Sequence, residues 1–323
     1  MFLSRNLYTK GRLLPALLLL LGGCASLPPA VQELAADAGP IELEHTPFYP
    51  QQRYQCGPAA LTTVLTMSGA NVSLPEIVEK VYLPEKQGSL QVELLAATRT
   101  SGRLPYVIDG ILSAIWSELA AGRAVVVLQN LGVAAIPRWH YAVVVGVDPQ
   151  QRQVVLRSGT DLRRITATTT FLRTWQRGDF WAMVALRPDE LPADVDQGRY
   201  FEAIVALEQA GQLDAAALAW QTALQAWPHA ATALFGLGNI QLAAGQFAAA
   251  EELYRKLLAR DEQLLVARNN LALALAEQQK FDAALAEIAM ALAQNSDAAL
   301  ASELENTQEM IKSMLAAHDG HSP

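Results

Sequence analysis

The chain has 323 residues, of which 51% are hydrophobic and 17% charged, so it is long enough for two hydrophobic cores and is not intrinsically disordered. Its net charge of −8 argues against a nucleic acid as partner, because phosphate binding requires a basic surface. The acidity is concentrated late in the chain, where residues 196–323 carry 16 acidic and 7 basic side chains. Two cysteines are too few for a disulfide framework, and no cysteine–histidine pattern has zinc spacing, so we expect no metal and no cofactor.

Residues 1–23 have the composition of an export signal. Basic residues precede an apolar stretch from Leu13 to Leu21, which is too short to span a bilayer. The stretch ends in Leu21-Gly22-Gly23-Cys24, which resembles a bacterial lipobox, whose cysteine is lipidated and becomes the mature N-terminus. The alternative is an ordinary cleaved signal with an incidental cysteine. Because no aspartate follows Cys24, we expect an outer-membrane lipoprotein that faces the periplasm, with residues 24–40 as a tether.

Residues 41–190 are predicted to form one α+β domain. A helix of about three turns should begin near Cys56 and end before Gly69, because proline just inside a helix start and glycine after its end are favoured. The apolar run 124–129 predicts a buried strand, and the runs 141–147 and 153–156, joined by a turn with Pro149, predict a hairpin. Further helices are expected from residue 73 and over 91–100 and 111–121, with a last strand over 181–186. Early helices followed by a late antiparallel sheet are typical of the α+β class.

Residues 196–318 repeat with a fixed period. The motif Gly211-Gln212-Leu213 recurs at residues 245–247 and 279–281, a spacing of 34 in both steps. A small residue and then a large one follow at the same register, as in Ala216 and Trp220. This pattern resembles the tetratricopeptide repeat, a helix–turn–helix unit, and predicts about three units plus a capping helix. A generic helical bundle is the alternative. Such repeats imply a protein partner.

Cys56 is the residue around which a reactive site is expected. Unpaired N–H groups and the helix dipole at a helix N-terminus stabilise a thiolate, and that makes a cysteine nucleophilic. A nucleophile of this kind also needs a base, a group that orients the base, and donors for the oxyanion. For the oxyanion we expect the Cys56 N–H and a side-chain amide from Gln51, Gln52 or Gln55, although three glutamines in five positions also fit a solvated loop.

His140 is the expected base, because it opens the hydrophobic strand 141–147, whereas the other histidines lie in a turn, in the tail or in an irregular segment. Hairpin geometry places position 140 opposite about 159 or 160. Among the polar residues there we favour Asp161 as the group that orients His140, with Ser158 as the rival. Asp148 lies at the wrong end of the hairpin.

Two motifs together, residues 51–65 and Arg138-Trp139-His140 through Asp148, resemble the C39 and C39-like cysteine peptidases over roughly residues 47–186. The resemblance implies a papain-like fold, with Cys56 as nucleophile, His140 as base and Gln51 as the oxyanion glutamine. One position departs from the family. Where the family has Asp-Pro after the histidine strand, this chain has Ser158-Gly159, so Asp161 substitutes, Ser158 orients His140 less strongly, or the site is a Cys–His dyad. The order of lipobox, C39-like domain and repeats resembles lipoprotein cysteine peptidases.

Three functions are compatible with these features. The first is a membrane-anchored peptidase that cleaves an envelope protein or exported peptide, with the repeats recruiting the substrate or a partner. The second is an acyl or amide transferase of the same fold. The third is a catalytically degenerate scaffold that binds a partner through the repeats.

Overall fold

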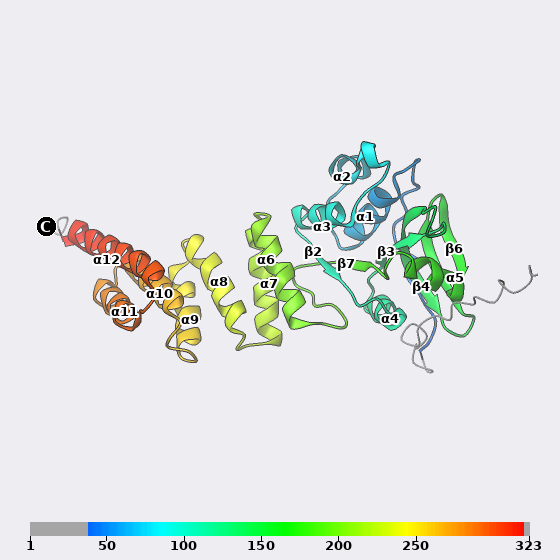
Figure 1. Ribbon diagram of the computed structural model, residues 1–323. Coiled ribbons are helices and arrows are strands. Elements are labelled where there is room, and N and C mark those ends of the chain that lie inside the picture. The colour runs from blue at the N-terminus through cyan, green and yellow to red at the C-terminus, as the bar shows by residue number, and fades with distance from the viewer. Residues whose placement is uncertain (1–37, 320–323) are drawn as a thin grey trace, which may run out of the picture.

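The computed structural model describes residues 38–319 and has two parts, a mixed α/β part and a row of helices that leads away from it (Figure 1). The expected signal segment, Cys24 and most of the tether lie outside the described residues. Within residues 38–319, no helix combines the length and the apolar composition that a membrane span needs.

The first part is built on one antiparallel sheet with the strand order β2-β7-β3-β4-β5-β6, and β1 pairs with the far end of β4. The strands are β1 (Ile41–Glu42), β2 (Leu104–Val107), β3 (Val125–Asn130), β4 (Trp139–Asp148), β5 (Gln153–Ser158), β6 (Asp161–Ala167) and β7 (Ala182–Leu186). Its helices are α1 (Cys56–Met67), α2 (Leu74–Val81), α3 (Gln91–Thr100), α4 (Leu112–Ala120) and α5 (Thr168–Gln176). The α+β class is therefore confirmed.

Helices cover both faces of this sheet. Side chains alternate along a strand, so β4 contributes to two cores. Val143 and Val145 pack into a cluster with Leu61 of α1, together with residues of α2 and α3. Ala142 and Val144 pack instead into a second cluster that contains residues of α4 and α5. Because β4 is buried on both faces, its sequence reads as a nearly continuous apolar run.

The predicted hairpin is β4–β5, and the sheet continues through β6, a strand that the apolar pattern did not indicate. A bulge between Val144 and Gly146 shifts the β4–β5 register by one residue. β6 is an edge strand, largely exposed and rich in charged residues, so it has none of the alternation by which a half-buried strand is recognised. β6 is nevertheless a strand, because it forms backbone hydrogen bonds with β5.

The second part consists of antiparallel helix pairs, as the 34-residue period predicts. The helices are α6 (Gln197–Gln209), α7 (Leu213–Ala226), α8 (Ala231–Ala243), α9 (Phe247–Leu258), α10 (Leu265–Glu277), α11 (Phe281–Gln294) and α12 (Ala298–Asp319). Gly236 and Gly238 of α8 lie so close to Trp220 and Tyr254 that a β-carbon at either position would lie 2.7 Å from the ring. The small and large residues of the repeat therefore mark where helices cross.

The hydrophobic core of the first part extends into the repeats. The cluster that contains Leu104 and Tyr106 also contains Tyr200 of α6 and Trp220 of α7. The Tyr106 hydroxyl accepts a hydrogen bond from the Asp196 N–H at 2.9 Å. The first repeat is thus packed onto the sheet rather than joined to it by a free linker.

Candidate active site

Cys56 is the first residue of α1, as its neighbouring glycine and proline predict. The chain enters the helix through a tight turn in which the Gln55 N–H donates to the Gln52 carbonyl at 3.1 Å. Tyr54 lies within this turn at φ +68°, a left-handed conformation that is unfavourable for a residue with a β-carbon. Strain of this kind is common where a functional side chain must be held in one place.

The thiol of Cys56 is subject to two opposed effects. Burial raises its pKa, because a thiolate is poorly solvated inside the protein. The backbone N–H groups of Tyr141, Gly57 and Cys56 itself lower the pKa, but burial is the larger effect. The Tyr141 N–H belongs to the residue that follows His140, so the sulfur of Cys56 lies against the start of β4.

Gln51 lies at the same site. It lines a small cavity together with Cys56, Tyr141 and Ser158. Its backbone N–H donates to the Gly159 carbonyl at 3.2 Å, which fixes the segment before the cysteine to the turn between β5 and β6. The structure therefore brings Gln51 and Cys56 to the same small cavity, and the oxyanion role of Gln51 stays a prediction.

His140 is hydrogen bonded to Ser158, with 2.8 Å between Nε2 and Oγ. Burial lowers the pKa of His140 to about 4, and the positive charge of Arg164 contributes to the shift. Within the described chain, no hydrogen bond joins the imidazole to the thiol of Cys56. At neutral pH the resting site therefore consists of a neutral thiol, a neutral imidazole and a neutral hydroxyl.

Asp161, the residue that we favoured for orienting His140, is not its hydrogen-bond partner. Ser158 ends β5, directly beside β4, whereas Asp161 begins β6, one strand further away. Two strand spacings amount to about 10 Å, which is beyond the reach of an aspartate side chain. The Asp161 carboxylate is 57% exposed and lies 3.8 Å from Arg164. Asp148, at the far end of β4, accepts a hydrogen bond from the Gln151 N–H in the hairpin turn.

A loop with exposed apolar side chains lies next to His140, between β3 and β4. The Asn130 side-chain oxygen accepts hydrogen bonds from the N–H groups of Gly132 and Arg138, both at 2.9 Å, and so closes the base of the loop. Its exposed apolar residues are Leu131, Val133 and Ile136, and the exposed Trp139 follows them as the first residue of β4. Exposed apolar surface of this kind next to a site is typical of a surface that binds a ligand.

Comparison with known families agrees with the fold and with the order of the parts. The family described as Peptidase_C39 like matches residues 43–180, and the tetratricopeptide repeat family matches residues 195–264. The chain thus contains a C39-like peptidase domain followed by tetratricopeptide repeats.

Two solved peptidase structures are similar to part of this chain. A protein from Bacillus anthracis described as a C39-like peptidase is 15% identical with a TM-score of 0.39, and the alignment covers 46% of this chain and 98% of that one. The peptidase domain of Streptococcus ComA, a bi-functional ABC transporter of a quorum-sensing pathway, is 20% identical with a TM-score of 0.36, covering 44% of this chain and 98% of that one. No curated protein matches the chain.

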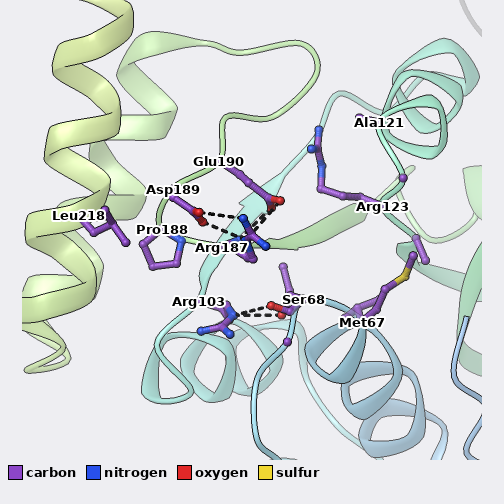
Figure 2. A pocket seen from close by; sticks show the side chains of 15 residues that line it. Met67, Ser68, Arg103, Ala121, Arg123, Arg187, Pro188, Asp189, Glu190 and Leu218 are labelled. Carbon is purple, nitrogen blue, oxygen red and sulfur yellow. Dashed lines mark hydrogen bonds and ion pairs between the residues drawn. The ribbon is translucent and has the colours of Figure 1, made fainter.

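A larger cavity of about 540 Å³ lies between the C39-like domain and the first repeat (Figure 2). It is bordered by Ser68 at the C-terminal end of α1 and by Leu218 of α7. At 1.5 Å per residue, the length of α1 places it roughly 18 Å from Cys56. Arg187, which lines this cavity, is ion-paired with Asp189 at 2.8 Å and with Glu190 at 3.5 Å on the same segment. The cavity therefore lies where the C39-like domain meets the first repeat, has charged residues in its lining, and is not part of the thiol site.

No cluster of histidine, cysteine, aspartate and glutamate side chains within residues 38–319 has the geometry of a metal site. Two residues that the sequence reasoning did not single out belong to the candidate active site. The Tyr141 N–H acts on the sulfur, and Arg164 acts on the imidazole. A main-chain group leaves no sequence signal, and Arg164 lies on a strand that the pattern did not reveal.

Proposed function

We propose that this protein is a thiol peptidase of the cell envelope, in which Cys56 attacks a peptide carbonyl and His140 transfers the protons. The observation that carries the proposal is the convergence at one point of a helix-start cysteine, the upstream Gln51 and the beginning of the histidine strand. The family match to the C39-like domain supports the same reaction class.

The proposed reaction requires that Nε2, which is hydrogen bonded to Ser158, carries the proton of the neutral imidazole. With the Nε2–H of His140 donating to the Ser158 oxygen, Nδ1 carries the free lone pair and is the atom that accepts the thiol proton. The Ser158 hydroxyl can orient the ring in either tautomer, but it has no charge with which to stabilise the imidazolium. Ser158 is therefore a positioning residue of modest strength.

The reaction then has two halves. As the thiol proton passes to His140, sulfur bonds to the carbonyl carbon and the π electrons move to oxygen, where the Cys56 N–H and the Gln51 amide donate hydrogen bonds. Collapse of this intermediate breaks the C–N bond, and the leaving amine takes the proton from the imidazolium. Water attacks the resulting thioester while His140 accepts its proton, and the expelled sulfur recovers that proton as the acid leaves.

The repeats and the signal segment give the proposal its cellular setting. Lipidation of Cys24 would hold the enzyme on the periplasmic side of the outer membrane, where envelope proteins and exported peptides are the available substrates. Tetratricopeptide repeats bind protein segments, so we assign to residues 195–264 the recruitment of the substrate or of a partner. The apolar loop beside His140 offers contacts to the residues next to the cleaved bond.

Alkylation of the single described cysteine tests this proposal. We expect iodoacetamide to label Cys56 at neutral pH, and His140→Ala to slow the labelling by about tenfold or more, because the base that takes the thiol proton is gone. Cys56→Ser should remain unlabelled, and the melting temperature of His140→Ala reports whether the domain is still folded. Equal labelling rates with and without His140 would sink the mechanism and leave the scaffold function as the better account.

A further inference from the structure

The loop between β3 and β4 has an exposed apolar tip, residues 131–137. These residues read LGVAAIP, so no side chain among them is polar, and all but the glycine are exposed. Within residues 38–319, Ile136 and Val133 are the two most exposed large apolar side chains, at 71% and 62%. Single apolar residues are normal on a protein surface, but a continuous exposed run of this kind indicates a binding surface.

The backbone of the loop holds the tip in one shape. The Leu131 N–H donates to the Arg138 carbonyl at 2.9 Å across the base of the loop. Within the tip, the Ile136 N–H donates to the Val133 carbonyl at 3.0 Å. A β-carbon on Gly132 would collide with the Ile136 carbonyl oxygen, so the two sides of the loop are in close contact. The tip is therefore preorganised, and a binding partner does not have to order it first.

The base of the loop differs in composition from the tip. The exposed Arg138 is followed by Trp139, which starts β4 and is 56% exposed. Arg177 is also exposed, and it donates hydrogen bonds to the neutral carbonyl of Asn130 at the base of the loop. Residues 128–180 as a whole contain seven arginines and three aspartates and no other charged side chain. The apolar tip thus has positive charge and an aromatic ring at its base, in a molecule of net charge −8.

We propose that residues 131–139 dock the C39-like domain onto an anionic membrane surface. A bilayer offers the two environments that these residues match, an apolar interior for the tip and a negatively charged headgroup layer for Arg138 and Arg177. Tryptophan is enriched at the boundary between the two environments, which fits Trp139 at the base of the loop. A protein partner is recognised through polar contacts as well, and the tip supplies no polar side chain for them.

The length of the chain before residue 38 allows a lipid anchor and the loop to reach the same bilayer. Cys24, the expected lipidation site, lies 14 residues before residue 38 (38 − 24), and 14 residues extend to at most about 50 Å. The described sheet begins with β1 beside Val147, near the far end of β4. The loop lies at the other end of β4, about 30 Å away. The tether is therefore longer than the distance that it has to cover.

The inference rests on the envelope location in the proposed function and not on the chemistry at Cys56. It assigns the tip to the membrane, and the base of the loop, beside His140, stays available to the substrate. Docking then holds the thiol site next to the bilayer. Segments of proteins that lie close to the membrane surface are therefore the substrates within its reach.

Vesicle sedimentation tests the inference on the mature chain without its lipid, residues 24–323 with Cys24→Ser, which contains the whole described fold. The vesicles consist of phosphatidylcholine alone or of phosphatidylcholine mixed with phosphatidylglycerol. We expect binding to the anionic vesicles. The double variant Val133→Ser, Ile136→Ser should bind them about tenfold more weakly, because two apolar side chains no longer enter the bilayer. The matched control is Leu90→Ser, Val92→Ser, which changes two apolar side chains of 43% and 61% exposure outside the loop and should bind like wild type.

Arg138→Gln measures the electrostatic contribution separately. It should weaken binding to the anionic vesicles by about fivefold at low salt, as expected for one charge at a headgroup layer, and should leave binding to phosphatidylcholine unchanged. The control is Arg152→Gln, which removes the same charge from the exposed hairpin turn at the far end of β4 and should bind like wild type.

The outcomes separate this inference from the proposed function. Wild type that binds neither kind of vesicle, or a loss that is equal in the tip variant and in the Leu90, Val92 control, would overturn the membrane assignment and leave alkylation of Cys56 as it is. Wild-type dimers that the tip variant dissociates in analytical ultracentrifugation, with vesicle binding unaffected, would assign the tip to a contact between two copies instead. A Cys56 that iodoacetamide does not label would overturn the proposed peptidase without changing vesicle binding.

Discussion

Burial opposes charge on both Cys56 and His140 in the candidate active site. It raises the pKa of Cys56 and lowers that of His140 to about 4, so a thiolate–imidazolium pair is disfavoured before a substrate binds. Main-chain N–H groups lower the pKa of Cys56 and offset part of the effect of burial. The hydrogen-bond partner of the imidazole is instead the neutral hydroxyl of Ser158. Protonation of His140 is therefore the least favourable step of the proposed reaction.

Replacement of Ser158 tests that conclusion. In Ser158→Asp a carboxylate takes the place of the hydroxyl, so we expect the pKa of His140 to rise from about 4 toward its usual value. Each pKa unit regained corresponds to roughly tenfold in the population of imidazolium, and iodoacetamide labelling of Cys56 at pH 7 should increase. NMR titration of His140 measures the first effect and alkylation kinetics the second. The control is Ser158→Asn, which has the shape of aspartate without its charge. If the two variants titrate alike, charge at position 158 is not what the site lacks.

The sequence sufficed to place Cys56, Gln51 and His140 near one another, because each occupies a position with a local signal: a helix start, the segment before it and a strand start. The orienting residue could not be chosen in the same way. Counting across the hairpin led to residues 159 and 160, but β5 ends at Ser158 and the chain turns at Gly159, where φ is +67°. Ser158, the rival candidate, is the last residue that still lies beside β4.

At the scale of elements, the position of α1 depends on a close contact between its first turn and the segment before α3. A β-carbon on Gly57 would lie 2.6 Å from both side-chain atoms of Ser89. Only glycine at position 57 allows this approach, and Gly57 directly follows Cys56, the proposed nucleophile. The packing of α1 against the segment before α3 thus helps to fix where the sulfur lies.

Gly57→Ala is expected to destabilise the domain by about 1–2 kcal/mol, since overpacking costs more than the helix propensity that alanine adds. The second-site change Ser89→Gly removes both atoms that the new methyl group would meet, so the double variant should recover most of the loss. Urea unfolding of the two single variants and the double variant measures this. Purely additive effects would contradict the contact as the cause.

The elements most open to sequence reasoning were those with a period or a boundary residue. The helix at Cys56–Met67, the buried strand at Val125–Asn130 and the 34-residue repeat all have such a signal, and all were found. β6 was missed because an edge strand exposed along most of its length obeys no apolar alternation. Its absence from the prediction also concealed Arg164.

At the scale of the whole molecule, the C39-like domain and the first repeat share one hydrophobic core. Tyr106 of β2 and Tyr200 of α6 belong to the same cluster, and Arg199 donates to the Val107 carbonyl at 3.0 Å. Asp196 begins the repeats and hydrogen bonds Tyr106 at the same time. The hydrophobic core is therefore continuous across the boundary between the C39-like domain and the repeats.

Removal of the repeats should consequently weaken the C39-like domain. A fragment of residues 38–195 loses the helices that cover Tyr106 and Leu104, and we expect its unfolding free energy to fall by about 3–5 kcal/mol, the value of two or three buried side chains. A fragment that ends after α8, at residue 244, keeps this part of the core and serves as the control. Urea unfolding followed by the exposure of Cys56 to a thiol reagent compares the two. Equal midpoints would mean that the domain does not depend on the repeats.

If the proposed peptidase acts on proteins held by the repeats, the shared core also determines where such a protein can be cut. Because the first repeat shares a hydrophobic core with the sheet, we expect its surface and Cys56 to keep a fixed separation. A substrate held on the repeats would then reach the thiol only through a stretch of chain of matching length. Such an enzyme acts as a molecular ruler: the cleaved bond should lie at a set number of residues from the recruited segment, and inserting residues between the two should move the cut by the same number.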